Sequence, residues 1–65
     1  YRLRGDSKRK LGDYQGAIND YSKAIEIYPN KAYLYNYRAE SKLKLGDNEG
    51  ADEDNRKAEK LKNIF

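Results

Sequence analysis

Carboxylates are the side chains best suited to acid–base chemistry in this chain, which contains no His and no Cys. The densest group is Asp52, Glu53 and Asp54, preceded closely by Asp47 and Glu49. Consecutive residues on a helix point in different directions, so these carboxylates should not converge on one substrate. The group also lacks the ligand spacing and the glycine of a calcium loop. The sequence therefore predicts no catalytic residue, no metal site and no cofactor.

Basic and aromatic residues are the other groups that could bind a ligand. The chain has 14 Lys and Arg against 11 Asp and Glu, with seven Tyr. Tyr beside Arg or Lys can stack on RNA bases, but a net charge of +3 with interspersed signs argues against nucleic acid. Tyr33 and Tyr37 are the candidates for free stacking. Packing explains the other five better: Tyr1, Tyr14, Tyr21, Tyr28 and Tyr35.

A repeat of 34 residues determines where these side chains must lie. When residues 1–31 are placed on residues 35–65, 13 of the 31 pairs are identical. A period of this length indicates stacked units, each too small to bury its own apolar face. We expect one domain over residues 1–65, with repeat 1 at 1–31 and repeat 2 at 32–65. Such an architecture is typical of scaffolding and binding proteins.

Two kinds of break divide the chain into four expected helices, at about 1–11, 14–28, 31–45 and 48–62. In Gly12-Asp13 and Gly46-Asp47, Gly can end one helix and Asp can cap the next. Pro29-Asn30 is the other break, where Asn30 should cap the third helix. The predicted fold class is all-α, with two tandem antiparallel helical hairpins. The helix at 48–62 should cap the array, because polar residues replace the apolar ones of the helix at 14–28: Asp52, Asn55 and Glu59 stand for Ile18, Tyr21 and Ile25.

The period, the hairpins and the spacing of small residues together resemble the tetratricopeptide repeat, with its signature Trp-x2-Leu-Gly-x2-Tyr, Ala-x3-Phe-x2-Ala and Pro. The first unit has at these places Tyr1, Arg4, Gly5, Lys8, Ala17, Tyr21, Ala24 and Pro29. The second has Tyr35, Arg38, Ala39, Lys42, Ala51, Asn55, Ala58 and Asn63. The resemblance implies a fragment of a right-handed α-solenoid that mediates protein–protein interaction. Its small residues should mark close contacts between helices.

Both units depart from the family in the same way. The family's Leu is replaced by Arg4 and Arg38, and its Tyr by Lys in each unit. An Arg at a packed position is costly unless it is paired. Asp20 and Asp54 follow the two Arg at the same offset of 16 residues, which places them opposite in an antiparallel hairpin. We therefore expect two Arg–Asp pairs, with Asp20 reaching Arg38 as the alternative.

In the family, the first helices of the hairpins line a concave groove that binds a peptide or helix. These helices are basic here, with net charges of +4 for residues 1–12 and +3 for residues 31–46, whereas residues 13–30 and 47–65 each carry −2. The resemblance thus implies an acidic peptide ligand, although alternating charge also attracts antiparallel neighbours. Asp6, Glu40 and Leu43 should share the groove with the candidate peptide-binding residues Arg2, Arg9, Lys10, Tyr33, Asn36, Tyr37 and Lys44.

Two other functions remain as alternatives: a basic repeat that binds nucleic acid, and a purely structural cap of a longer array. The chain does not begin with Met, which indicates a piece of a longer protein. Repeat arrays usually need about three units, so we expect this fragment to form a homo-oligomer or a domain-swapped dimer. No apolar run is long enough for a membrane span. Without Cys the compartment is undetermined, with the cytoplasm slightly favoured.

Overall fold

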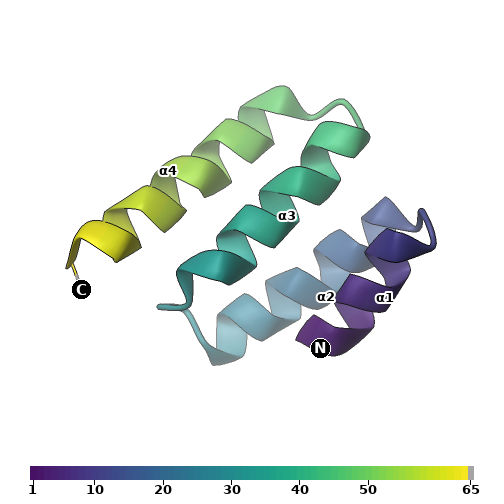
Figure 1. Ribbon diagram of the computed structural model, residues 1–65, viewed down its shortest axis with the longest axis horizontal. Helices are drawn as coiled ribbons and strands as arrows, with labels where there is room; N and C mark the ends of the chain where they lie inside the picture. The colour runs from purple at the N-terminus through teal and green to yellow at the C-terminus, as the bar shows by residue number, and fades with distance from the viewer. Residues whose placement is uncertain (65) are drawn as a thin grey trace.

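The computed structural model describes residues 1–64 as four helices, each packed on the next in chain order (Figure 1). They are α1 (Arg2–Lys10), α2 (Tyr14–Ile27), α3 (Ala32–Lys44) and α4 (Asn48–Ile64). The predicted all-α fold of two antiparallel hairpins is therefore confirmed. The first three helices lie within one residue of the expected bounds, and α4 continues two residues further than expected.

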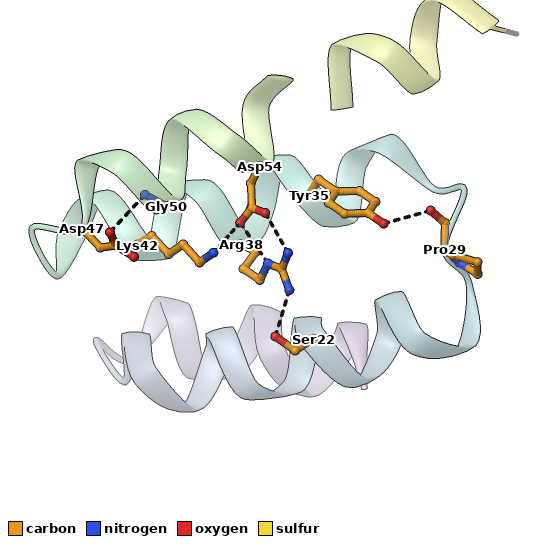
Figure 2. Close-up of polar contacts among 8 residues, drawn as sticks. All are labelled: Ser22, Pro29, Tyr35, Arg38, Lys42, Asp47, Gly50 and Asp54. Carbon is orange, nitrogen blue, oxygen red and sulfur yellow. Dashed lines mark hydrogen bonds and ion pairs between the residues drawn. The ribbon is translucent and has the colours of Figure 1, made fainter. Parts of the chain in front are cut away.

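The two Gly-Asp turns close their hairpins in the way the sequence predicts. Gly12 adopts a φ of 86°, in the left-handed region that glycine tolerates best. The N–H groups of Gly12 and Asp13 donate to carbonyls in the last turn of α1, at 3.1 and 2.8 Å. The Asp13 carboxylate then accepts the N–H of Gly16 at 3.0 Å, which caps the start of α2. The same contacts recur 34 residues later, at Gly46, Asp47 and Gly50 (Figure 2).

The connection between the hairpins corrects one prediction. Lys31, and not Asn30, precedes α3, and no side chain caps the first turn of this helix. Asn30 lies with Pro29 in the turn, and Lys31 stands between it and the first residue of α3. A side chain of α3 stabilises the connection instead: the Tyr35 hydroxyl donates to the Pro29 carbonyl oxygen at 3.0 Å (Figure 2).

The small residues that were expected at close contacts between helices lie inside the structure. All six candidates are buried: Gly5, Ala17, Ala24, Ala39, Ala51 and Ala58. Gly5 has a specific reason to be glycine, because a Cβ at this position would lie 2.9 Å from Cε1 of the buried Tyr21 ring. In the second unit exposed Asn55 replaces this aromatic residue, and the equivalent of Gly5 is Ala39.

The apolar core has two parts that share one residue. One part lies where α2 meets α3 and contains Tyr21 and Leu34, and the other lies between α3 and α4 around Tyr35 and Leu61. Ile25 of α2 packs against both parts. On the side of α4 that does not pack against α3, Asp52, Asn55 and Glu59 are exposed. None of the helices in the described residues is both long and apolar enough to span a membrane.

Candidate functional site

The second hairpin is closed by a buried carboxylate that binds two cations. Asp54 of α4 accepts hydrogen bonds from Nε and Nη2 of Arg38, at 2.9 and 2.7 Å. The Lys42 ammonium, one turn further along α3, lies 3.0 Å from Oδ2 of the same carboxylate, the oxygen that also accepts from Nε of Arg38. Figure 2 shows all three side chains meeting between α3 and α4. The bidentate geometry with Arg makes these hydrogen bonds strong and directional.

The first hairpin has the same arrangement, with Asp20 bound by Arg4 and Lys8. The Arg4 guanidinium donates to both carboxylate oxygens, at 3.0 and 2.8 Å, and the Lys8 ammonium lies 3.2 Å away. The hydrogen bond from Arg4 holds the pKa of Asp20 below its ordinary value, and Lys8 acts in the same direction, although burial opposes them. The predicted Arg–Asp pairs are confirmed, and Asp20 does not reach Arg38. We call each group of Arg, Lys and Asp a clasp.

The lysines of the clasps are not predicted by the repeat pattern. Lys8 and Lys42 replace a family Tyr in both units, and this substitution alone names no partner for them. A signal was present, because each Lys follows its Arg by four residues. Residues four apart lie on the same side of a helix, so a carboxylate opposite the Arg is also within reach of the Lys.

A second polar cluster links α1 to α3, and Arg9 is at its centre. The Arg9 guanidinium donates to a Glu40 carboxylate oxygen at 2.5 Å and lies 3.8 Å from the Asp6 carboxylate. Its Cζ also lies 5.1 Å from the centre of the Tyr37 ring, within the range of a cation–π interaction. The Tyr21 hydroxyl in turn donates to Oδ1 of Asp6, with 2.5 Å between the two oxygens. Burial of the hydroxyl, with this bond, raises the pKa of Tyr21 well above its ordinary value.

Arg2 and Tyr33 extend the cluster toward the N-terminal end of α1. The Arg2 guanidinium carbon lies 5.8 Å from the Tyr33 ring centre, and the rings of Tyr33 and Tyr37 meet edge to face at 5.9 Å. Beside Tyr33 there is a cavity of about 110 Å³. Three helices and the residues at their ends line it: Tyr1 just before α1, Arg2 of α1, Ala24 and Ile27 of α2, Tyr28 just after α2, and Tyr33 and Leu34 of α3.

Four of the seven candidate binding residues therefore meet on one surface. We define the α1–α3 surface by Arg2, Asp6 and Arg9 of α1 together with Tyr33, Tyr37 and Glu40 of α3. The other three candidates take no part in its contacts. Lys10 and Lys44 are exposed and form no ion pair within residues 1–64, and Asn36 is partly buried without a side-chain hydrogen bond there.

The tyrosines do not all behave as the repeat pattern suggests. Tyr21 and Tyr35 are buried, as expected. Tyr1 and Tyr28, which were also expected to pack, are more than half exposed beside the cavity, because they lie at the end of their helices where no further helix covers them in residues 1–64. Tyr37 packs against Tyr21 with ring centres 5.7 Å apart, so Tyr33 is the more accessible of the two stacking candidates.

The carboxylates at residues 52–54 do not form a common site. Asp54 is buried in its clasp, whereas Asp52 and Glu53 are exposed on α4. In the part of the chain that the structure describes, no three acidic side chains lie close enough together to bind a metal ion.

The repeat pattern has a counterpart among known protein families. A family model described as TPR repeat matches residues 5–46. This range includes most of α1, all of α2 and α3, and the first Gly-Asp turn, and it ends at Gly46 in the second turn. The match covers more than half of the chain. A search of curated proteins finds none that matches.

Proposed function

This chain belongs to the tetratricopeptide repeat family, and we propose that it binds a partner peptide or helix along the α1–α3 surface. The family is a non-catalytic repeat module that mediates protein–protein interaction, and we propose no enzymatic activity for this chain. The observation that carries the proposal is the row formed by Arg2, Tyr33, Tyr37 and Arg9 across two helices. Arg and Tyr are enriched among the residues that dominate binding energy at protein interfaces.

The charges of this surface favour an acidic ligand. Arg2 and Arg9 are partly neutralised by Asp6 and Glu40. Lys10 and Lys44 are not part of this surface but border it, because Lys10 follows Arg9 directly and Lys44 lies four residues after Glu40 on the same helix; neither has an acidic partner within residues 1–64. Cations therefore exceed carboxylates, and an acidic peptide would meet complementary charge on approach.

The cavity beside Tyr33 supports an apolar anchor in the ligand. Its volume of about 110 Å³ suits one side chain and is well below that of the pockets that hold small-molecule ligands. Its aromatic and aliphatic walls would contact an apolar residue, while Arg2 at the rim could pair with a neighbouring carboxylate. The proposed ligand is therefore an acidic segment that carries an apolar or aromatic residue.

Selection of random short peptides on the whole chain, followed by fluorescence anisotropy with the recovered sequences, tests this function. We expect sequences rich in Asp and Glu around an aromatic or aliphatic residue. Lys44→Ala and Tyr33→Ala should each weaken their binding about fivefold to tenfold, as interface contacts of this kind do. Lys60→Ala, at an exposed position on α4, is the matched control and should bind like the wild type.

The two alternative functions give different results in the same assay. A nucleic-acid-binding repeat would bind a single-stranded RNA oligonucleotide, and would lose roughly a thousandfold or more in affinity between low and physiological salt. A purely structural fragment would recover no peptide that depends on Lys44 or Tyr33. Either result would contradict the proposal.

We also propose that the isolated chain self-associates. Tyr1 and Leu3 at the start of α1 are more than half exposed, and a closed two-fold pair or an exchanged hairpin would cover them. Sedimentation at increasing concentration should show a dimer or a larger species. A monodisperse monomer at millimolar concentration, with a cooperative melt, would show that two hairpins suffice.

A further inference from the structure

Arg9 on the α1–α3 surface is held differently from the arginines of the two clasps. Arg4 and Arg38 each donate two hydrogen bonds to one carboxylate. Arg9 donates a single hydrogen bond within residues 1–64, from Nη1 to Oε2 of Glu40 at 2.5 Å. Its Nη2 lies 3.8 Å from Oδ1 of Asp6, and its buried Nε has no acceptor in the same residues. The Arg9 guanidinium therefore keeps the capacity to donate to a further carboxylate.

Packing holds the Arg9 guanidinium in place without the help of Glu40. The Arg9 side chain is 21% exposed, and its Cζ lies 5.1 Å from the centre of the Tyr37 ring. Glu40 is 53% exposed and contacts the guanidinium through one oxygen. An ion pair with so exposed a partner contributes little to stability, so Glu40 can leave while Arg9 stays on the ring. Asp6 is less easily displaced, because it also accepts the Tyr21 hydroxyl.

Lys44 offers Glu40 an alternative partner on the same helix. It is exposed four residues after Glu40, and it forms no ion pair within residues 1–64. Residues four apart lie on the same side of a helix, and Glu before Lys is the favourable order for an ion pair. If the Glu40 side chain turns from Arg9 to Lys44, one ion pair replaces another. This exchange costs less than breaking the contact with Arg9 outright.

We propose that Arg9 is an anion subsite that Glu40 covers in the free chain, and that a carboxylate side chain of the ligand takes its place while Glu40 pairs with Lys44. This inference rests on the proposed function, because it concerns the same surface. The ligand group is an Asp or Glu, since a Glu side chain holds its place in the free chain. A ligand carboxylate that accepts from both Nη1 and Nη2 of Arg9 makes the paired hydrogen bonds that Glu40 does not make.

The exchange makes Glu40 a specificity-determining residue. A neutral side chain such as Gln brings Arg9 no charge in place of that of Glu40, so it leaves the subsite covered. A carboxylate restores the charge pairing of Arg9 and frees Glu40 for Lys44. Lys44 is then a positioning residue, which raises the affinity for an acidic ligand by pairing with Glu40 and not by touching the ligand.

Two blocked peptides test the exchange on the whole chain. The Glu probe is acetyl-Glu-Glu-Phe-Glu-Glu-amide, and the Gln probe carries Gln in place of each Glu. The blocked ends remove the terminal charges, so side chains supply every carboxylate. Binding is followed by NMR, with backbone signals for the affinity and the Nε–H signal of Arg9 for the subsite. The Glu probe should shift the Arg9 signal, and the Gln probe should leave it in place.

Variants of the chain measure the cost of uncovering the subsite. Glu40→Gln should bind the Glu probe about threefold more tightly than the wild type, because the contact with Arg9 no longer has to be broken. Its affinity for the Gln probe should not change. Glu59→Gln removes the same charge at an exposed position on α4, and this matched control should bind as the wild type does. Lys44→Ala should weaken binding of the Glu probe about fivefold in the wild type, but less than about twofold in Glu40→Gln.

The outcomes separate this inference from the proposed function. If the Glu probe bound wild type and Glu40→Gln equally well, and Tyr33→Ala weakened it, the inference would be wrong and the proposed function would stand. Binding without a shift of the Arg9 signal, or equal losses from Lys44→Ala in both backgrounds, would also refute the exchange. If neither wild type nor Glu40→Gln bound the Glu probe, both proposals would fail. Binding by Glu40→Gln alone would support the covered subsite and contradict the function proposed for the wild type.

Discussion

Removal of the Asp54 carboxylate should be among the most damaging single changes in this chain. Asp54→Ala deletes the acceptor of two Arg38 hydrogen bonds and of the Lys42 ion pair. The two cations would then remain between α3 and α4, with Ser22 as the one hydrogen-bond partner left to Arg38 in residues 1–64.

The magnitude follows from how far water can replace the lost carboxylate. Breaking a buried ion pair from one side costs about 3–5 kcal/mol in free energy of unfolding. Arg38 and Lys42 are 20% and 19% exposed, so partial hydration should bring the cost to the lower end, ~3 kcal/mol. A chain of this length has a total stability on the order of 3–10 kcal/mol. The melting temperature should therefore fall by roughly 12–24 °C.

Thermal and urea unfolding followed by circular dichroism would measure this loss, with Asp52→Ala as the matched control. Asp52 lies two residues earlier on the same helix and is exposed, so its replacement removes the same charge and adds the same helix-favouring Ala. We expect the control to change stability by less than about 0.5 kcal/mol. If the two variants melted within a degree or two of each other, the clasp would not stabilise the hairpin and the reasoning would be refuted. If Asp54→Ala did not fold, Asp54→Asn would provide the measurable intermediate.

Three further predictions concern acid sensitivity and packing. Because the pKa of Asp20 is lowered on folding, its contribution is fully present above the ordinary Asp pKa of about 3.9 and is lost as pH falls through the folded value. The stability difference between the wild type and Asp20→Asn should therefore shrink over this acid range, and a constant difference in urea titrations would contradict the assignment. Gly5→Ala should lower the free energy of unfolding by about 1 kcal/mol in spite of the better helix propensity of Ala, because the added Cβ meets the buried Tyr21 ring. Equal or higher stability would show that the ring moves aside without cost. Ala24→Leu should cost roughly 1–3 kcal/mol by overpacking, and an unchanged melting temperature would rule out a close contact there.

The fold could be predicted because its main determinants are local. The Gly12-Asp13 turn ends one helix and caps the next with contacts that span at most five residues, so the residue types alone specify it. The Arg–Asp pairs could be predicted because a turn of three residues between the helices fixes which residues lie opposite. The prediction for Asn30 is wrong because capping depends on where the backbone leaves the turn at Pro29 and Asn30, which a local propensity does not determine.

The candidate site was predictable only in part. The register of the repeat family indicated Arg2, Arg9, Tyr33 and Tyr37, but it could not show that Arg9 is shared between Asp6 and Glu40. Such pairings depend on how α1 crosses α3, which is set by the size of the side chains between them. The close approach of Gly5 to Tyr21 is of the same kind. The sequence shows a small residue, and only the packed structure shows the ring that requires it.

The clasps also bear on how the chain folds. Each Asp finds both cations inside its own hairpin, 12 and 16 residues earlier in the chain, so the strongest polar contacts close short loops. Short loops cost little entropy to close, and proteins rich in such contacts cross their folding barrier in microseconds to milliseconds. The hydrogen bond between Ser22 and Arg38 joins different hairpins, and it forms only when α2 and α3 are already helical. The hairpins should therefore assemble as separate nuclei, and the joining of α2 to α3 should be the later and cooperative step.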